Sequence, residues 1–266
     1  MVGGRLGVAG VGAAWRFLAT AWRRAWAAML ITAALLGAPW ALGLWSPRSP
    51  WRLEALLALA AAAVMAEGAL YRIALGTERP GPGGLQWGRP EWRLGAVWAL
   101  TVAFLSVLGL LAFVAVLATA FGVASAGRGF VMALPSTWAG AVDGRGRAVV
   151  GVVGALCLAG MVWAGTRIAL GAAASIDRGR VQLLATWVQT RRLVLPILVG
   201  RFLLGIGPIA LAWLLLGAMP RGGHPPSVPL LWTASMAAGL VLAGLWLPLS
   251  VGLMAYLYRR CPPAPA

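Results

Sequence analysis

The chain has 266 residues, of which 61% are hydrophobic and only 11% are charged. A soluble globular domain carries about 25% charged residues, and a chain this apolar has too little polar surface to cover itself in water. We therefore expect an integral membrane protein and no soluble domain. The net charge of +16 comes entirely from arginine, because the chain has no lysine. The arginines lie at the edges of apolar runs, which favours membrane orientation over nucleic-acid binding.

A tryptophan-rich segment precedes the first long apolar run. In "AAWRFLATAWRRAW", Trp15, Leu18, Trp22 and Trp26 recur at helical spacing and share one face. This pattern is typical of an amphipathic helix that lies in the membrane interface. We therefore predict a cytoplasmic N-terminal segment over residues 1–24, which the three tryptophans anchor at headgroup depth.

Six apolar runs are long enough to cross a bilayer, since a spanning helix needs about 20 residues. The predicted spans cover residues 25–45, 53–75, 94–118, 148–170, 193–219 and 228–257. They form one transmembrane domain over 25–258, followed by a cytoplasmic tail over 259–266. The expected fold class is thus an all-α membrane protein, with six transmembrane helices arranged as three hairpins and with amphipathic interfacial helices before the first and fifth.

The distribution of arginine predicts how these spans are oriented. With six spans, both termini lie on one side of the membrane. That side holds 15 arginines and the other side holds 6, with Arg201 left out because it lies inside a span. The positive-inside rule then places both termini in the cytoplasm.

The pentapeptide RIALG occurs twice, at Arg72–Gly76 and at Arg167–Gly171. Each copy lies where an even-numbered span ends, and Arg259 lies in the same way at the end of the sixth span. We expect these arginines to face anionic headgroups and to complement the negative ends of their helix dipoles. True internal repetition and coincidence in a chain rich in Ala, Leu and Gly are both open interpretations. The predicted hairpins do not depend on the choice.

The loop "GTERPGPGGLQWGRPEWR" joins the second and third spans. Its glycines and prolines argue against a long helix, and we expect Trp87 and Trp92 to lie at the interface.

The segment "RGRVQLLATWVQTRR" precedes the fifth span. Val181, Leu184 and Val188 recur there at helical spacing, which predicts a second interfacial helix with Trp187 as an anchor. Anchoring is the favoured interpretation of all these segments. The alternative is a docking surface for a cytoplasmic partner.

The inventory of reactive side chains argues against an enzyme. The chain has six acidic residues, one histidine (His224) and no lysine, and no HExxH, GxSxG or Walker A motif. The two cysteines, Cys157 and Cys261, lack the spacing of a metal site or a redox pair. We therefore expect no catalytic centre, no cofactor and no bound metal.

Two charged residues lie well inside the predicted spans, away from their ends. Glu67 lies in the inner half of the second span, and Arg201 lies within the fifth. Charges in the hydrocarbon are costly, so each raises a functional hypothesis that names its partner. We predict that Glu67 pairs with Arg201 or with Arg72 in the inner half of the bundle. The alternatives are that Arg201 snorkels to the interface and that Glu67 is protonated or lies near headgroups.

The segment "VQLLATWVQTRRLVLPILVGRFLL" (181–204) resembles a recurring feature of a group of bacterial membrane proteins. In that group an interfacial "SW-x-L-T-R" helix leads into a span rich in Leu and Gly. The group includes poorly characterised six-helix inner-membrane proteins and the membrane domain attached to some glycerophosphodiester phosphodiesterases. The catalytic barrel of those enzymes has no counterpart here, so the resemblance implies a bacterial inner-membrane protein without an assigned reaction.

Together these patterns favour an accessory, scaffold or lipid-interacting membrane protein. Its expected partners are membrane lipids, with a cytoplasmic or membrane protein as a further partner and with no nucleic acid. The alternative is a permease subunit that a separate ATPase energises, because six spans, cytoplasmic termini and an amphipathic helix before the first span would suit that role.

Overall fold

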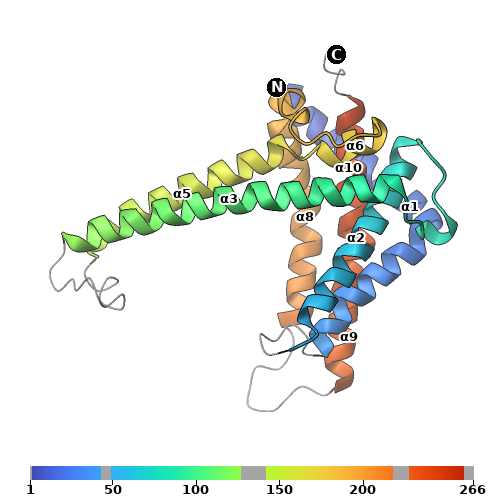
Figure 1. Ribbon diagram of the computed structural model, residues 1–266, viewed down its shortest axis with the longest axis horizontal. Helices are drawn as coiled ribbons and strands as arrows, with labels where there is room; N and C mark the ends of the chain where they lie inside the picture. The colour runs from blue at the N-terminus through green and yellow to red at the C-terminus, as the bar shows by residue number, and fades with distance from the viewer. Residues whose placement is uncertain (1, 43–48, 127–141, 218–227, 261–266) are drawn as a thin grey trace. The chain divides into compact units, whose positions relative to one another are not determined.

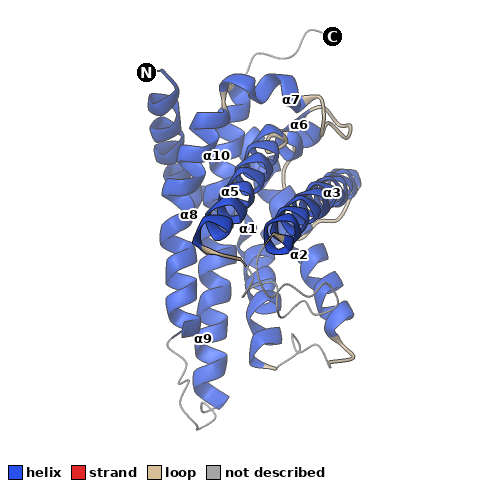
Figure 2. Cartoon of the chain, turned by 90° about the vertical axis from the view of Figure 1, so that its left-hand side faces the viewer, coloured by secondary structure: helices blue, strands red, loops and turns tan. Residues whose placement is uncertain are grey.

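The computed structural model describes residues 2–42, 49–126, 142–217 and 228–260. These residues are almost entirely helical and include no strand (Figure 2). The α-helices are α1 (Val2–Ala41), α2 (Arg52–Leu75), α3 (Arg89–Ser125), α5 (Gly144–Arg167), α6 (Gly171–Asp177), α7 (Thr186–Gln189), α8 (Val194–Gly217), α9 (Val228–Leu240) and α10 (Leu247–Arg259). The 3₁₀ turns η1 (Pro82–Gly84) and η2 (Thr190–Arg192) lie in connections, and the π turn η3 (Val241–Trp246) joins α9 to α10. The expected all-α class is confirmed for the described residues.

Within the described residues, five helical segments are long and apolar enough to cross a membrane, as expected of a multi-pass membrane protein. They are Arg52–Leu75, Pro82–Ser125, Gly144–Asp177, Val194–Gly217 and Pro229–Arg259. The first predicted span is not among them. Several predicted positions lie outside the described residues, namely 43–45 of the first span, 218–219 of the fifth, most of the tail, His224 and Cys261.

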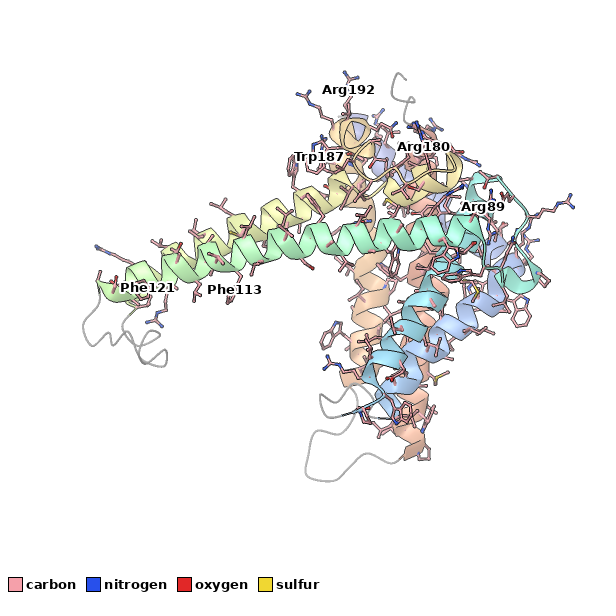
Figure 3. All side chains as sticks on the ribbon, in the orientation of Figure 1. Arg89, Phe113, Phe121, Arg180, Trp187 and Arg192 are labelled. Carbon is pink, nitrogen blue, oxygen red and sulfur yellow. The ribbon has the colours of Figure 1, made fainter. Side chains whose placement is uncertain are left out.

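The chain divides into two compact units, and α3 passes from one to the other. Unit 1 comprises Met1–Trp98 and Ala169–Ala266, and unit 2 comprises Ala99–Ile168. In unit 2 the greater part of α3 runs beside α5 (Figure 1), and the Gly146 backbone lies against Val123. Phe113 projects from α3 with 63% of its surface exposed (Figure 3). The two helices bury almost none of their apolar side chains within the chain, so this surface is suited to lipid contact.

Helix α1 is the central element of unit 1, because it packs against α2, α8, α9 and α10 (Figure 1). It bends at Ala25, where φ is −127° and ψ is 21°. Gly83 and Gly84, both with positive φ, bring the loop before α3 against α1 at this bend. The residues of α1 before the bend pack on α8 and α10, and those after it pack on α2 and α9. The predicted N-terminal segment is thus continuous with the helix that follows it.

Glycines let these helices approach closely. Gly10 on α1 and Gly200 on α8 lie against Leu253 of α10, and a Cβ on either would stand 2.7 Å from its side chain. Further along α1, a Cβ on Gly37 would stand 2.6 Å from the carbonyl oxygen of Ser235 on α9. Small residues commonly allow helices to pack closely in membranes. Gly200 does so here, whereas Gly207 on the same helix faces open space.

The segment before α8 does not form the predicted interfacial helix. After α6, Gly179 adopts a positive φ of 65°, and the chain reaches α8 through turns, the four-residue α7 and η2. Val181, Leu184 and Val188 are nevertheless all exposed, at 42–73% of their surface. They were expected on one helical face, and they reach the surface from irregular backbone because Leu183 and Thr186 turn inwards to the core.

The two RIALG copies adopt different conformations. In the first copy, Gly76 ends α2 with φ 67° and donates its N–H to the Arg72 carbonyl at 2.8 Å. In the second copy, α5 ends at Arg167 and Gly171 begins α6. Arg72 was expected to face headgroups, but it is fully buried. The same five residues therefore end one helix and join two others, because the surrounding contacts decide their conformation.

A π turn in the last span explains the contact that Trp22 makes. The N–H of Leu247 donates to the Leu242 carbonyl, five residues back, so η3 is wider than an α-helix. Pro248 follows, and because proline has no N–H, the Gly244 carbonyl lacks the donor that an α-helix would supply. The indole N–H of Trp22 donates to this carbonyl oxygen at 2.8 Å. A side chain of α1 thus satisfies a carbonyl that would otherwise lie unpaired in apolar surroundings.

The substitution Trp22→Phe keeps an aromatic ring and removes this donor. We expect it to lower the free energy of unfolding by about 1–3 kcal/mol, since a buried carbonyl loses its partner. Trp15→Phe is the matched control, because Trp15 lies on the same helix and is 52% exposed. Thermal unfolding in mild detergent, followed as loss of monodisperse protein, provides the measurement. Equal midpoints for the two variants would show that the hydrogen bond is not stabilising.

Candidate functional site

Unit 1 contains an apolar cavity of about 670 Å³. The cavity lies between α1, α2, the first turns of α3, α8, η3 and α10. Its apolar wall includes Leu56, Leu59, Leu204, Ile209, Leu242 and Leu247. Two charged side chains also line it, Glu67 and Arg201. The volume is typical of a small-molecule site, and so is an apolar wall with few polar groups.

Glu67 projects from α2 and is 9% exposed. Its Oε2 accepts a hydrogen bond from the indole N–H of Trp98 at 2.7 Å. Trp98 lies on α3 about two and a half turns after its start, so this bond joins α3 to α2 inside unit 1. A hydrogen bond to the carboxyl group reduces the cost of placing Glu67 in apolar surroundings.

Arg201 reaches the same cavity from α8 and is exposed at the surface of unit 1. It lies close enough to Glu67 for an electrostatic interaction. Among the described residues, however, no salt bridge joins the two side chains. The structure thus brings Glu67 and Arg201 to one cavity without the predicted ion pair, and the partner that Glu67 contacts is Trp98.

Arg72, the other predicted partner of Glu67, forms a buried ion pair with Glu91. Nη2 of Arg72 lies 2.6 Å from Oε1 of Glu91, and both side chains have no exposed surface. The prediction that Arg72 could pair with Glu67 is therefore wrong. Arg72 lies near the end of α2 and Glu91 in the first turn of α3, so the pair holds the two helix ends together.

The local sequence explains how Glu91 reaches this position. Its Oε2 accepts a hydrogen bond from the Gly88 N–H at 2.8 Å, three residues back. A glutamate at the third helical position satisfies the residue before a helix in this way. Gly68 provides the space on α2, because a Cβ there would stand 2.8 Å from Oε1 of Glu91.

The predicted tryptophan anchors differ in their surroundings. Trp15 and Trp26 are each 52% exposed, and Trp87 and Trp92 pack edge to face with ring centroids 5.4 Å apart. All four remain available to an interface. Trp22 is bound to Gly244 as described above, and Trp187 is half-buried.

The chemistry of the cavity is that of a binding site. It combines a long apolar wall with one carboxyl group and one guanidinium group. Within the described residues, His, Cys, Asp and Glu side chains nowhere gather in threes as a metal site would require. An amphipathic molecule with an apolar part and an anionic part matches these surroundings.

The sequence matches no protein-family model, and comparison with the curated proteins and with the solved structures finds no match either. The resemblance of residues 181–204 to bacterial inner-membrane proteins therefore stays a prediction.

The position of Glu91 does not follow from the sequence. The glycines and prolines of its segment predict a loop, with the third span beginning at residue 94. A signal was present, because Pro90 and Glu91, two and three residues after Gly88, are typical of the first turn of a helix. That signal predicts the helix start but not the arginine that Glu91 meets.

We expect Glu91→Gln to lower the free energy of unfolding by about 3–5 kcal/mol, because it removes the only buried counter-charge that contacts the Arg72 guanidinium among the described residues. Glu54→Gln is the control, since Glu54 is exposed in the first turn of α2. Gly68→Ala should be destabilising as well, because its new methyl group would meet the Glu91 carboxylate. Chemical unfolding in detergent measures all three variants. A Glu91→Gln variant as stable as Glu54→Gln would contradict the role of the pair.

Proposed function

We propose that this protein is an inner-membrane component without a catalytic centre that holds a lipid or a similar amphipathic molecule in the cavity of unit 1. The observation that carries the proposal is the composition of the cavity wall. Nearly all of it is apolar, and Arg201 brings a cation to its edge from the middle of an apolar helix. An anionic headgroup beside Arg201, with its chain along the leucines, would satisfy both parts of the wall.

A bound anionic lipid would also offset the free-energy cost of placing Arg201 within a span. A lone arginine in a span is unfavourable unless water, a headgroup or an anion meets it. Glu67 already accepts a hydrogen bond from Trp98 on one carboxyl oxygen, so only its other oxygen is open to Arg201. A bound anionic lipid would supply the missing partner and would leave the unit 1 helices in place.

Two tryptophan substitutions at neighbouring alanines of α2 test whether the cavity binds lipid. Ala63 lines the cavity, whereas Ala61 is exposed and lies outside it. We expect Ala63→Trp to reduce the lipid that co-purifies in mild detergent several-fold, since the indole fills the cavity, and Ala61→Trp to leave it unchanged. Native mass spectrometry measures the bound lipid directly.

Equal lipid retention by both tryptophan variants would contradict the proposal. A stoichiometric ATPase in the same preparation, without retained lipid, would instead support the alternative of a permease subunit. Arg201→Gln adds a second test, because it should reduce retention of anionic lipids more than that of zwitterionic ones.

We further propose that α1 provides a sixth span, with both termini in the cytoplasm. After its bend, α1 lies between two candidate spans. Thr32 donates a hydrogen bond to the Ala62 carbonyl of α2 at 3.2 Å, and Gly37 packs on Ser235 of α9. A helix packed between two spans lies at the same depth as they do, and residues 25–41 are only slightly shorter than the about 20 that a crossing needs.

Reporter fusions at the two ends test this topology. Six spans place both termini on the same side, and the excess of arginine places that side in the cytoplasm. We therefore expect a fluorescent reporter to be active, and a periplasmic phosphatase reporter to be inactive, at either terminus. Opposite responses at the two ends would show that α1 does not cross the membrane.

A further inference from the structure

A second cavity, of about 410 Å³, lies in unit 1 beside the ends of α2 and α6. We call it the arginine pocket. Three arginines and two acids are among the residues that line it, namely Arg72, Arg93, Arg178, Glu78 and Asp177. It is separate from the apolar cavity, with which it shares no lining residue.

Arg72, the most buried arginine of this pocket, has N–H donors without an acceptor in the described part of the chain. Arg72 is fully buried, and only its Nη2 lies in close contact with an anion, the Oε1 of Glu91. Its Nε and Nη1 have no hydrogen-bond partner among the described residues. The next carboxylate oxygen, Oε2 of Glu78, stands 3.9 Å from Nη1. A buried guanidinium with open donors is costly unless an acceptor reaches them.

Arg93 brings a second guanidinium to the same pocket. It takes part in no hydrogen bond or ion pair with any described residue. Its Nη1 lies over Gly179, 3.3 Å from where a Cβ would stand, and the positive φ of Gly179 shapes this part of the wall. The side chain is therefore held near the pocket without an acceptor of its own.

The acids around the pocket are largely engaged. Glu91 accepts from Gly88 and faces Arg72, and the Oδ2 of Asp177 accepts from the Tyr258 hydroxyl at 2.8 Å. Glu78 differs, because its side chain is 59% exposed and its contact with Arg72 is long. Its side chain lines the pocket and is open to solvent, so an incoming anion could displace it from Arg72.

We propose that the arginine pocket binds a phosphate group, and that Glu78 swings outwards from Arg72 when the phosphate enters. Nη1 of Arg72 and the guanidinium of Arg93 would donate to the phosphate oxygens. Arginine forks match tetrahedral oxyanions in geometry and charge. The group can belong to a lipid headgroup or to free phosphate, since both present the same oxygens. The proposal does not depend on the lipid proposed for the apolar cavity.

The test uses the full chain in maltoside detergent and phosphate-free buffer, with sodium phosphate titrated in a calorimeter. We expect saturable binding that Arg93→Gln weakens about tenfold, the loss of one charge-assisted contact. Arg89→Gln is the matched control. Arg89 is one turn earlier on α3, exposed and outside the pocket, and it should change the affinity less than about twofold (Figure 3). Glu78→Gln should strengthen binding several-fold, because it removes the competing charge.

A second titration identifies the source of the phosphate. Soluble dihexanoyl phosphatidic acid is compared with sodium phosphate on the wild-type chain and on Arg93→Gln. Binding of the lipid alone, lost in Arg93→Gln, would assign a headgroup, and equal binding of both would assign free phosphate. The proposal is overturned if neither probe binds saturably, if Arg93→Gln and Arg89→Gln behave alike, or if Glu78→Gln weakens binding. Arg93 and Glu78 are not fully buried, so these variants should fold.

Discussion

A guanidinium group without exposed surface must find an anion inside the protein, and unit 1 is arranged around that requirement. Arg72 finds it in Glu91, and the contact fixes where α3 begins relative to where α2 ends. Each neighbouring feature serves the same pair. Gly68 leaves space for the carboxylate, and Gly88 donates to its second oxygen. Because a buried charge left alone is strongly destabilising, these residues depend on one another.

Once the start of α3 is fixed, Trp98 is brought to Glu67. The first turns of α3 therefore make two contacts that involve an acid in unit 1. Glu91 forms the fully buried ion pair with Arg72, and Trp98 donates to Glu67 beside the apolar cavity. The same turns of α3 contribute residues to both cavities, and the two cavities differ in the chemistry of their walls. One presents leucines with a single carboxyl and a single guanidinium, and the other presents mainly charged side chains. A chain with so few acids places four of its six around α2 and the start of α3, which are Glu67, Glu78, Glu91 and Glu54.

The sequence was informative where a pattern has one physical cause. Long uncharged runs can only be buried in lipid or protein, so the positions of α2, α8 and the last span followed from composition. Glu67 and Arg201 were found because a charge inside an apolar run is costly wherever it lies. Contacts between distant segments left no such pattern. The segment "GRPEWR" does not predict that Glu91 contacts Arg72. The residues around Trp22 do not predict that Pro248 leaves the Gly244 carbonyl without a backbone donor, so that Trp22 can bind it.

Local patterns also misled where two structures satisfy them equally. Three apolar residues at helical spacing before α8 are exposed, as an interfacial helix would have them, yet Gly179 and the turns after it break the helix. The identical RIALG pentapeptides adopt different conformations, because different segments of the chain pack against Arg72 and Arg167. In both cases the short segment lacks enough interactions of its own to determine its conformation.

The π turn η3 has a geometric effect beyond its hydrogen bond to Trp22. Each residue of an α-helix advances the direction of its side chain by about 100°, so one residue in excess rotates everything after it by that amount. The buried face of α9, with Ser235 and Ala238, is therefore out of phase with that of α10, with Leu249 and Leu253. This offset lets one continuous helix face the second half of α1 along its first part and the first half of α1 along its second.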